Sequence, residues 1–166
     1  MRSLEELIRE QTNLSVTQVA HLQHLASDWQ LIADLSFADL AIWVPIKDSG
    51  FIAMSHVRAA TAATVFPKDF EGEIRADLPS GESVESFPIA FNGQVIAQLN
   101  RHRNPMVTRS LGRLESTYQE IAQQLIEMVG EGTFPFDFAI SSLNPSPRVG
   151  DGFIRLDRLG VITYAS

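Results

Sequence analysis

The stretch at residues 84–101, VESFPIAFNGQVIAQLNR, constrains the fold more than any other part of the sequence. Two runs rich in Val, Ile and Phe flank Asn92-Gly93, a dipeptide that readily adopts positive φ at both central positions of a tight turn. The pattern predicts a β-hairpin with the pairs Phe91–Gln94, Ala90–Val95 and Ile89–Ile96. This register puts apolar side chains on both faces: Phe87, Ile89, Phe91 and Ile96 on one, and Ala90, Val95, Ala97 and Leu99 on the other. We therefore expect other parts of the chain to cover each face.

Composition narrows the class of protein. The chain has 166 residues, enough for one domain with a substantial core, and its 45% hydrophobic and 20% charged residues are typical of a globular protein. The net charge of −7 disfavours a nucleic-acid-binding surface. No stretch approaches the ~18 apolar residues of a membrane span, and the N-terminus lacks the apolar segment of a signal peptide. The absence of cysteine excludes disulfides and thiolate metal sites in this chain, and it agrees with a cytoplasmic location.

Two helices are expected before the first strand, at residues 3–11 and 15–37. Ser15 is a suitable N-cap for the second. The apolar stripe of that helix consists of Val16, Val19, Ala20, Leu25, Trp29, Ile32 and Leu35. The stripe can pack on the sheet or form a dimer seam, and the helix is long enough to do both.

Residues 40–46 and 51–58 are expected to form two strands joined by the turn sequence KDSG. One face of the pair then carries Trp43, Met54, His56 and Arg58, and the other carries Leu40, Ile42, Val44, Ala53 and Val57. The second set is a plain core face. The first set combines an aromatic floor with a cationic rim, which suits a small planar or anionic effector, and these four residues are the candidate ligand-binding residues. The alternative is that Trp43 and Met54 pack under a lid while Arg58 extends to solvent.

Residues 59–83 form the least regular part of the sequence and are the available lid for this face. The acids Asp69, Glu71 and Glu73 are interpreted as part of its solvated surface. Pro88, in the hairpin that follows, is expected to face Ala97, so the outer side of its strand should be a sheet edge or a bulge.

A closing helix is predicted for residues 110–131, with Gly130 or Gly132 ending it. Its stripe consists of Leu111, Leu114, Tyr118, Ile121, Ala122, Leu125, Met128 and Val129. Residues 134–150 contain three prolines and are interpreted as a linker. Residues 153–157 and 161–165 should form a small second hairpin, which is marginal in water by itself and therefore looks like the start of a further domain.

The predicted order of elements describes an α+β fold, an antiparallel sheet with long N- and C-terminal helices packed on one face. Together with the run SFPIAFNGQVIAQL, this arrangement resembles a GAF domain. A closer resemblance covers nearly the whole chain. The segments DWQLIADLSFADLAIWVP, EGTFPF and SPRVGDGFIRLDRLGVITYAS are similar to the N-terminal sensor region of actinobacterial cytosolic sensor histidine kinases.

The resemblance implies a domain organisation and a function. Residues 1–133 would be a GAF-like sensor domain, residues 134–150 a linker, and residues 151–166 the first hairpin of a PAS domain. In that family the PAS domain precedes a dimerisation and phosphotransfer module and a kinase domain that uses ATP and Mg²⁺. The chain itself would then be no enzyme and would need no cofactor. The expected partners are a second copy of the chain, a response regulator reached through the kinase module, and a small-molecule effector, with no nucleic acid and no membrane.

One feature departs from the family. Its members carry a longer segment between the second strand and the signature hairpin, where this chain has 25 residues, 59–83. Either the lid has been shortened, or a stretch close to residues 78–83 is missing from this sequence.

The remaining motifs give little support to catalysis. The sequence has no glycine-rich phosphate loop. His21 and His24 lie three apart but lack a third metal ligand, and His56 and His102 are each more typical of structural histidines than of haem ligands. The basic run RHRNP at residues 101–105 can bind an anion or pair with acids at the end of the sheet. Two hypotheses remain: a ligand-responsive sensor, and a dimerisation scaffold that binds no ligand.

Overall fold

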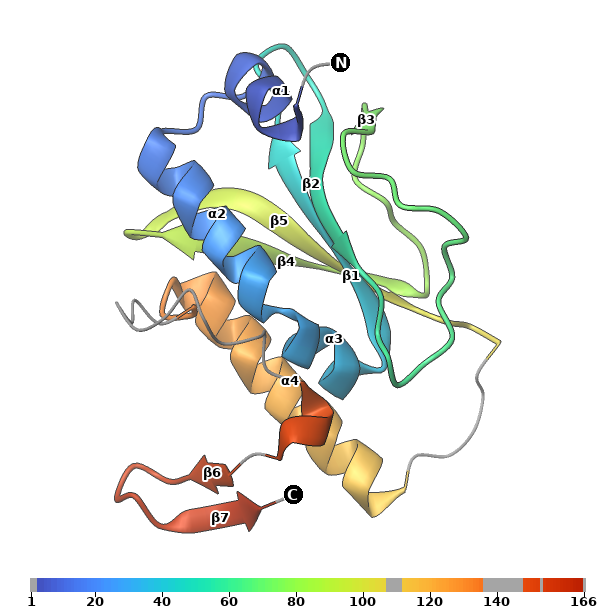
Figure 1. Cartoon of the computed structure of the whole chain (residues 1–166), viewed down its shortest axis with the longest axis vertical. Helices are drawn as coiled ribbons and strands as arrows, with labels where there is room; N and C mark the ends of the chain where they lie inside the picture. Colours follow the sequence, from blue (N-terminus) through green and yellow to red (C-terminus); the bar gives the residue numbers. More distant parts are fainter. Residues whose placement is uncertain (1–2, 107–111, 136–147, 153, 166) are drawn as a thin grey trace.

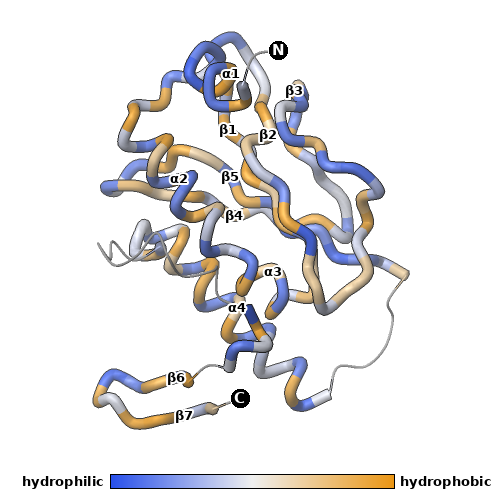
Figure 2. Tube along the Cα trace, viewed as in Figure 1, coloured by the Kyte–Doolittle hydropathy of each residue, from blue (hydrophilic) through white to orange (hydrophobic). Residues whose placement is uncertain are grey.

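The computed structural model describes residues 3–106, 112–135, 148–152 and 154–165. A five-stranded antiparallel sheet, in the order β3-β2-β1-β5-β4, separates a layer of helices from an irregular segment, residues 59–83 (Figure 1). The most apolar stretches belong to the strands and to the helix faces turned toward them (Figure 2). The α+β, GAF-like architecture predicted from the sequence is confirmed. None of the described helices has the length and hydropathy needed to cross a bilayer.

The N-terminal helices begin at serines, as predicted. Ser3 caps α1 (Leu4–Gln11) and Ser15 caps α2 (Val16–Asp28), and each forms a capping box with a side chain three residues later. The single helix predicted for residues 15–37 is divided, because α2 ends at Trp29 and α3 (Gln30–Ser36) begins there. Trp29 is only 2% exposed, and its side chain is anchored in the main core. The predicted stripe is correct over its buried part, whereas Val16 is 72% exposed.

The strands β1 (Ala38–Pro45) and β2 (Phe51–Val57) pair as expected, but a bulge changes which side chains share a face. Ile42 pairs with Ser55 and Trp43 pairs with Ala53, so Met54 is an extra residue in β2. Met54 therefore joins Ile42 in the core under the helices, while Ala53 joins Trp43 on the opposite face. The prediction that Met54 shares a face with Trp43, and Ala53 with Ile42, was wrong.

The hairpin of β4 (Val84–Phe91) and β5 (Gln94–Arg103) turns at Asn92-Gly93 as predicted, and both turn residues have positive φ. A second bulge shifts the register after the first two pairs, so Ile89 pairs with Ala97 and Pro88 pairs with Gln98. The pairs predicted for Ile89 and Pro88 were therefore wrong.

The bulge also corrects the predicted division of the hairpin into two apolar faces. Because of the bulge, the adjacent residues Ile96 and Ala97 both point into the same core. This core also contains Ile89 and Leu99, with Phe87 and Phe91 at its margin. Val95 is left 55% exposed. The expectation that the strand with Pro88 forms a sheet edge is confirmed, since β4 is the last strand.

The short strand β3 (Ile74–Arg75) pairs with β2 at the opposite edge and returns residues 59–83 to the sheet. Gly50, in the turn between β1 and β2, has a φ of 101°, and a Cβ there would lie 2.3 Å from the carbonyl oxygen of Arg75. Glycine is thus required for β3 to approach this turn.

The closing helix α4 (Arg113–Glu131) packs against α3 and β4 and ends at Gly132 in the left-handed conformation. The predicted start at residue 110 lies outside the described residues. The chain then continues to a 3₁₀ turn η1 (Val149–Asp151) and the small hairpin of β6 (Ile154–Leu156) and β7 (Ile162–Ala165). Tyr164 of this hairpin contacts Tyr118 of α4. The predicted second hairpin is confirmed, and most of the predicted linker lies outside the described residues.

Candidate functional site

The sheet face opposite the helices is covered by residues 59–83, hereafter the lid. Two phenylalanines of the lid, Phe66 and Phe70, contact aromatic side chains of three strands. Phe70 stacks on Trp43 of β1 at 5.6 Å between ring centroids and on His56 of β2 at 4.2 Å. Phe66 meets His56 and His102 of β5 edge-on, at 5.3 and 4.8 Å. We refer to these five residues as the aromatic cluster.

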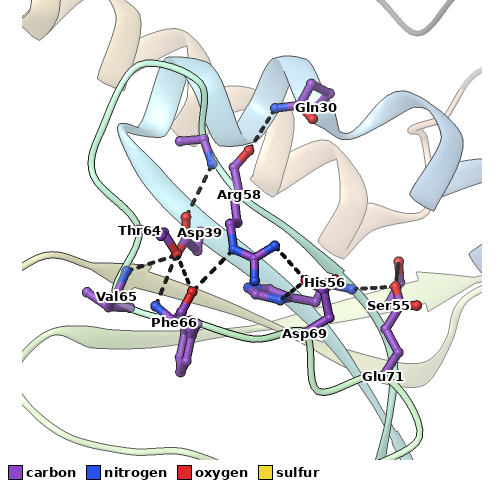
Figure 3. A network of polar contacts seen from close by, with 11 residues as sticks. Gln30, Asp39, Ser55, His56, Arg58, Thr64, Val65, Phe66, Asp69 and Glu71 are labelled. Atoms are coloured by element: carbon purple, nitrogen blue, oxygen red, sulfur yellow. Dashed lines mark hydrogen bonds and ion pairs between the residues drawn. The ribbon is translucent and has the colours of Figure 1, made fainter.

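A buried carboxylate fixes the beginning of the lid. Asp39 of β1 is 2% exposed and accepts hydrogen bonds from the backbone N–H groups of Ala59 and Val65, at 3.2 and 3.1 Å, and from the hydroxyl of Thr64 (Figure 3). The three donors span seven residues of chain, so this single side chain shapes the first loop of the lid.

Two more polar contacts hold the lid near its centre. Arg58 donates to the carbonyl oxygen of Phe66 at 3.3 Å and forms an ion pair with Asp69 at 2.6 Å (Figure 3). Glu71 accepts hydrogen bonds from the hydroxyl of Ser55 and from the backbone N–H of His56, at 3.2 and 3.1 Å. The predicted cationic rim residue is therefore a lid tether. The acids interpreted as a solvated surface are exposed, but they contact β2 and β3 through their carboxylates.

Both histidines of the cluster are poor bases in this environment. Burial, followed by the positive charge of Arg58, lowers the pKa of His56 even though Asp39 and Asp69 oppose the change. Burial and the neighbouring His56 lower the pKa of His102 to about 4. Both imidazoles are consequently neutral near pH 7, each with one nitrogen able to accept and one able to donate a hydrogen bond.

Five buried polar atoms on this face have no hydrogen-bond partner among the described residues: Trp43 Nε1, both ring nitrogens of His56, His102 Nε2 and Asn100 Oδ1. Of these, His56 Nδ1 lies 3.4 Å from the carboxylate of Asp69. Trp43 and Asn100 are fully buried, and His102 is 4% exposed. Asn100 pairs with Ala41 in the sheet and His102 pairs with Asp39, which places their side chains on the lid side of β5. The face therefore offers donors and acceptors that the phenylalanines of the lid cannot satisfy.

The structure brings together three of the four residues predicted from the sequence. Trp43, His56 and Arg58 lie beneath or against the lid, whereas Met54 lies on the helix side of the sheet. Sequence reasoning missed Asp39, Asn100, Phe66 and Phe70. The available signal was the i, i+4 spacing of two phenylalanines in an otherwise polar segment, and the alternation of Asn100 with His102 along an apolar strand.

The other polar motifs have structural roles. Arg101 is 3% exposed and pairs with Glu85 through two hydrogen bonds of 2.9 and 3.0 Å, so the basic run ends the sheet by pairing with an acid. Burial alone would raise the pKa of Glu85, but the hydrogen bonds and charge of Arg101 lower it overall. His21 contacts Phe91, and the described residues contain no group of three His, Asp or Glu side chains suited to a metal ion.

The chain is similar in sequence and in structure to sensory domains of histidine kinases. Residues 4–82 match the family described as the GAF domain of the histidine kinase PdtaS. The whole chain is 37% identical to the sensor histidine kinase PdtaS of Mycobacterium tuberculosis and 34% identical to that of Mycolicibacterium smegmatis. A solved structure described as the sensor region of a sensor histidine kinase is 40% identical and has a TM-score of 0.84, covering all of this chain and 65% of the other.

The fold and the lidded sheet face thus define a GAF-type sensory domain. More narrowly, the chain belongs to the GAF-containing sensory region of sensor histidine kinases of the PdtaS family. It spans 39% of the length of the curated relatives. Each match runs over 194 residues although this chain has 166, a difference of 28. The relatives therefore carry additional residues within the matched region.

Proposed function

We propose that this chain senses a small molecule that binds between the sheet and the lid, within a cytoplasmic two-component histidine kinase. The observation that carries the proposal is the group of unpartnered polar atoms on Trp43, His56, Asn100 and His102. Leaving such atoms unpaired costs about 1–3 kcal/mol each, and a ligand with complementary polar atoms would recover part of that free energy.

The surroundings indicate the chemical class of the effector. Trp43 and His56 present ring faces, which favour a planar molecule, and the polar atoms around them favour one with both donors and acceptors at its edge. Phe70 covers the faces of both rings in the present structure, and Phe66 meets His56 edge-on beside it. Binding would therefore displace the two lid phenylalanines, and the Arg58–Asp69 pair would have to open.

A route from the lid to the helices runs through α3. The carboxylate of Asp34 accepts hydrogen bonds from the backbone N–H of Ala60 at 2.8 Å and from the Gln30 side chain at 2.9 Å. Gln30 also donates to the carbonyl oxygen of Arg58 at 2.9 Å, and α3 packs against α4. Movement of the lid would thus alter how α3 contacts α4, the helix that leads toward residues 134–150.

The family relationship supports the remaining parts of the proposal. The parent protein would be a homodimeric, ATP- and Mg²⁺-dependent protein histidine kinase that phosphorylates a response regulator. Residues 151–166 would be the first hairpin of a PAS domain, in keeping with the exposed apolar side chains of β6 and β7. In this arrangement the chain regulates phosphotransfer and does not perform it.

The binding step is tested by differential scanning fluorimetry with a panel of nucleobases, nucleosides and related heteroaromatic compounds. At least one compound should raise the melting temperature of the 166-residue chain. Trp43→Phe and His102→Phe keep aromatic rings but remove polar nitrogens, so both should lose the shift. Val95→Thr, at an exposed position of β5, should retain it.

Phe66→Ala is the matched variant with an opened face. A panel that stabilises neither the wild type nor Phe66→Ala would refute ligand sensing at this face. A stable dimer that polar substitutions at the exposed Val16 of α2 or Leu114 of α4 disrupt would then favour the scaffold hypothesis.

A further inference from the structure

A cavity lies on the helix side of the sheet, where α1 and α2 meet β2. Its volume is about 440 Å³, within the range of small-molecule sites. Its apolar walls are formed by Leu4, Ile8, Val19, Ala26 and Met54, and an equal number of polar residues completes the lining. Ile8, Val19 and Met54 are each at most 7% exposed, so these walls belong to the folded core.

The bulge in β2 creates this cavity. Because Met54 and Ser55 occupy the place of one residue opposite Ile42, both of them line the cavity. A regular strand would have turned one of the two toward the lid. The cavity is therefore a consequence of backbone geometry, and it is separate from the aromatic cluster.

One end of the cavity carries a carboxylate held in position. Glu71 lines the cavity, and its Oε1 atom accepts hydrogen bonds from Ser55 Oγ and His56 N. Among the described residues Glu71 forms no ion pair, and no hydrogen bond reaches its Oε2 atom. The other acid of the rim, Glu5, is already paired with Arg9 at 2.7 Å. Glu71 thus presents a preorganised negative charge beside the apolar walls of the cavity.

We infer that this cavity is a binding site for an amphipathic cation, a primary ammonium group on a short aliphatic body. The aliphatic body would lie against Ile8, Val19 and Met54, and the ammonium group would donate hydrogen bonds to Glu71. Because Glu71 belongs to the lid and contacts β2 at Ser55 and His56, next to the bulge, an occupant here would also bias the lid.

The test is a titration of the 166-residue chain with n-hexylammonium, followed by NMR of ¹³C-methyl-labelled methionine. Met54 is the wall residue, and Met128 on α4 is an internal reference in the same spectrum. The Met54 methyl signal should shift saturably while the Met128 signal stays constant. Glu71→Gln should weaken binding roughly tenfold, because a charge-assisted hydrogen bond is lost. Glu73→Gln, where the acid is paired with Arg75, should leave binding unchanged.

Matched ligands and a filled cavity complete the test. The neutral n-hexanol should bind at least tenfold more weakly than the ammonium, and equal affinity would overturn the assignment of a cation. Ala26→Phe should abolish the Met54 shift. Should that variant fail to fold, Gln23→Phe fills the cavity from an exposed helix position. A Met54 signal that does not respond to hexylammonium in the wild type would overturn the site, whatever the heteroaromatic panel shows at the lid.

Discussion

The carboxylate of Asp39 should carry much of the stability of the lid. Each of its three hydrogen bonds is made to a carboxylate, one is buried and two are partly buried, and a hydrogen bond to a charged group contributes about 1.5–3 kcal/mol. Asp39→Ala would leave two backbone N–H groups and a hydroxyl without their acceptor. The lid lies at the surface, so these donors can reach water once it detaches. We therefore expect a loss of about 3–4 kcal/mol in the free energy of unfolding, below the simple total of the three bonds.

Two measurements check this expectation. Urea denaturation gives the global free energy of unfolding, and hydrogen exchange followed by mass spectrometry locates the change. Protection should fall in residues 59–70 and remain in β5. Asp48→Ala, which removes an exposed carboxylate from the turn between β1 and β2, is the matched control. A cost below about 1 kcal/mol for Asp39→Ala, with unchanged exchange in the lid, would refute the assignment of Asp39 as its anchor.

Three further predictions concern other parts of the fold. The pKa of His102 is about 4 in the folded protein and near 6.5 when unfolded, so the unfolded state binds the proton first. Acidification from pH 6.5 to pH 4 should therefore lower the free energy of unfolding by up to about 3 kcal/mol in wild type and by markedly less in His102→Phe, as measured by urea titration at each pH. Gly132→Ala should lower the free energy of unfolding by about 1–2 kcal/mol, because φ is +74° and the new Cβ would lie 3.0 Å from a carbonyl oxygen of β4. Gly130→Ala, inside the helix, should be neutral or stabilising, and thermal melts compare the two variants. Glu85→Gln should cost about 2 kcal/mol in chemical denaturation by weakening the partner of the buried Arg101, and no measurable loss would contradict that pairing.

The elements of the fold were largely predictable because strong local signals specify them. Ser3 and Ser15 mark helix starts, Asn92-Gly93 marks the hairpin, and Gly132 marks the end of α4. The break at Trp29 was not predictable, since the apolar period continues through it. Trp29 is buried in the main core, as it would also be in a continuous helix, so its burial gives no signal of the break.

The two errors of register have a common cause. Period-2 reasoning assigns faces correctly only while the strand stays regular, and a single inserted residue reverses every assignment beyond it. Met54 in β2 and Ile96 in β5 are such insertions, and neither has a glycine or proline beside it to signal a bulge. Trp43, His56 and Arg58 were therefore placed correctly on the lid side, and the core residue Met54 was wrongly placed with them.

The unpartnered polar atoms of the lid face allow sensing and scaffolding to be separated by measuring stability and ligand response in one variant. A scaffold has no use for buried indole and imidazole nitrogens, and phenylalanine would fill much of the same space without leaving them unpaired. His102→Phe should accordingly raise the free energy of unfolding at pH 7 by about 1 kcal/mol, since Phe66 already meets this ring edge-on. If the same substitution also abolishes the response to a planar effector, the wild-type histidine lowers the stability of the fold but is required for ligand recognition. A destabilised His102→Phe variant with an intact ligand response would mean that the imidazole serves packing, and the sensing surface would have to be sought elsewhere on the sheet.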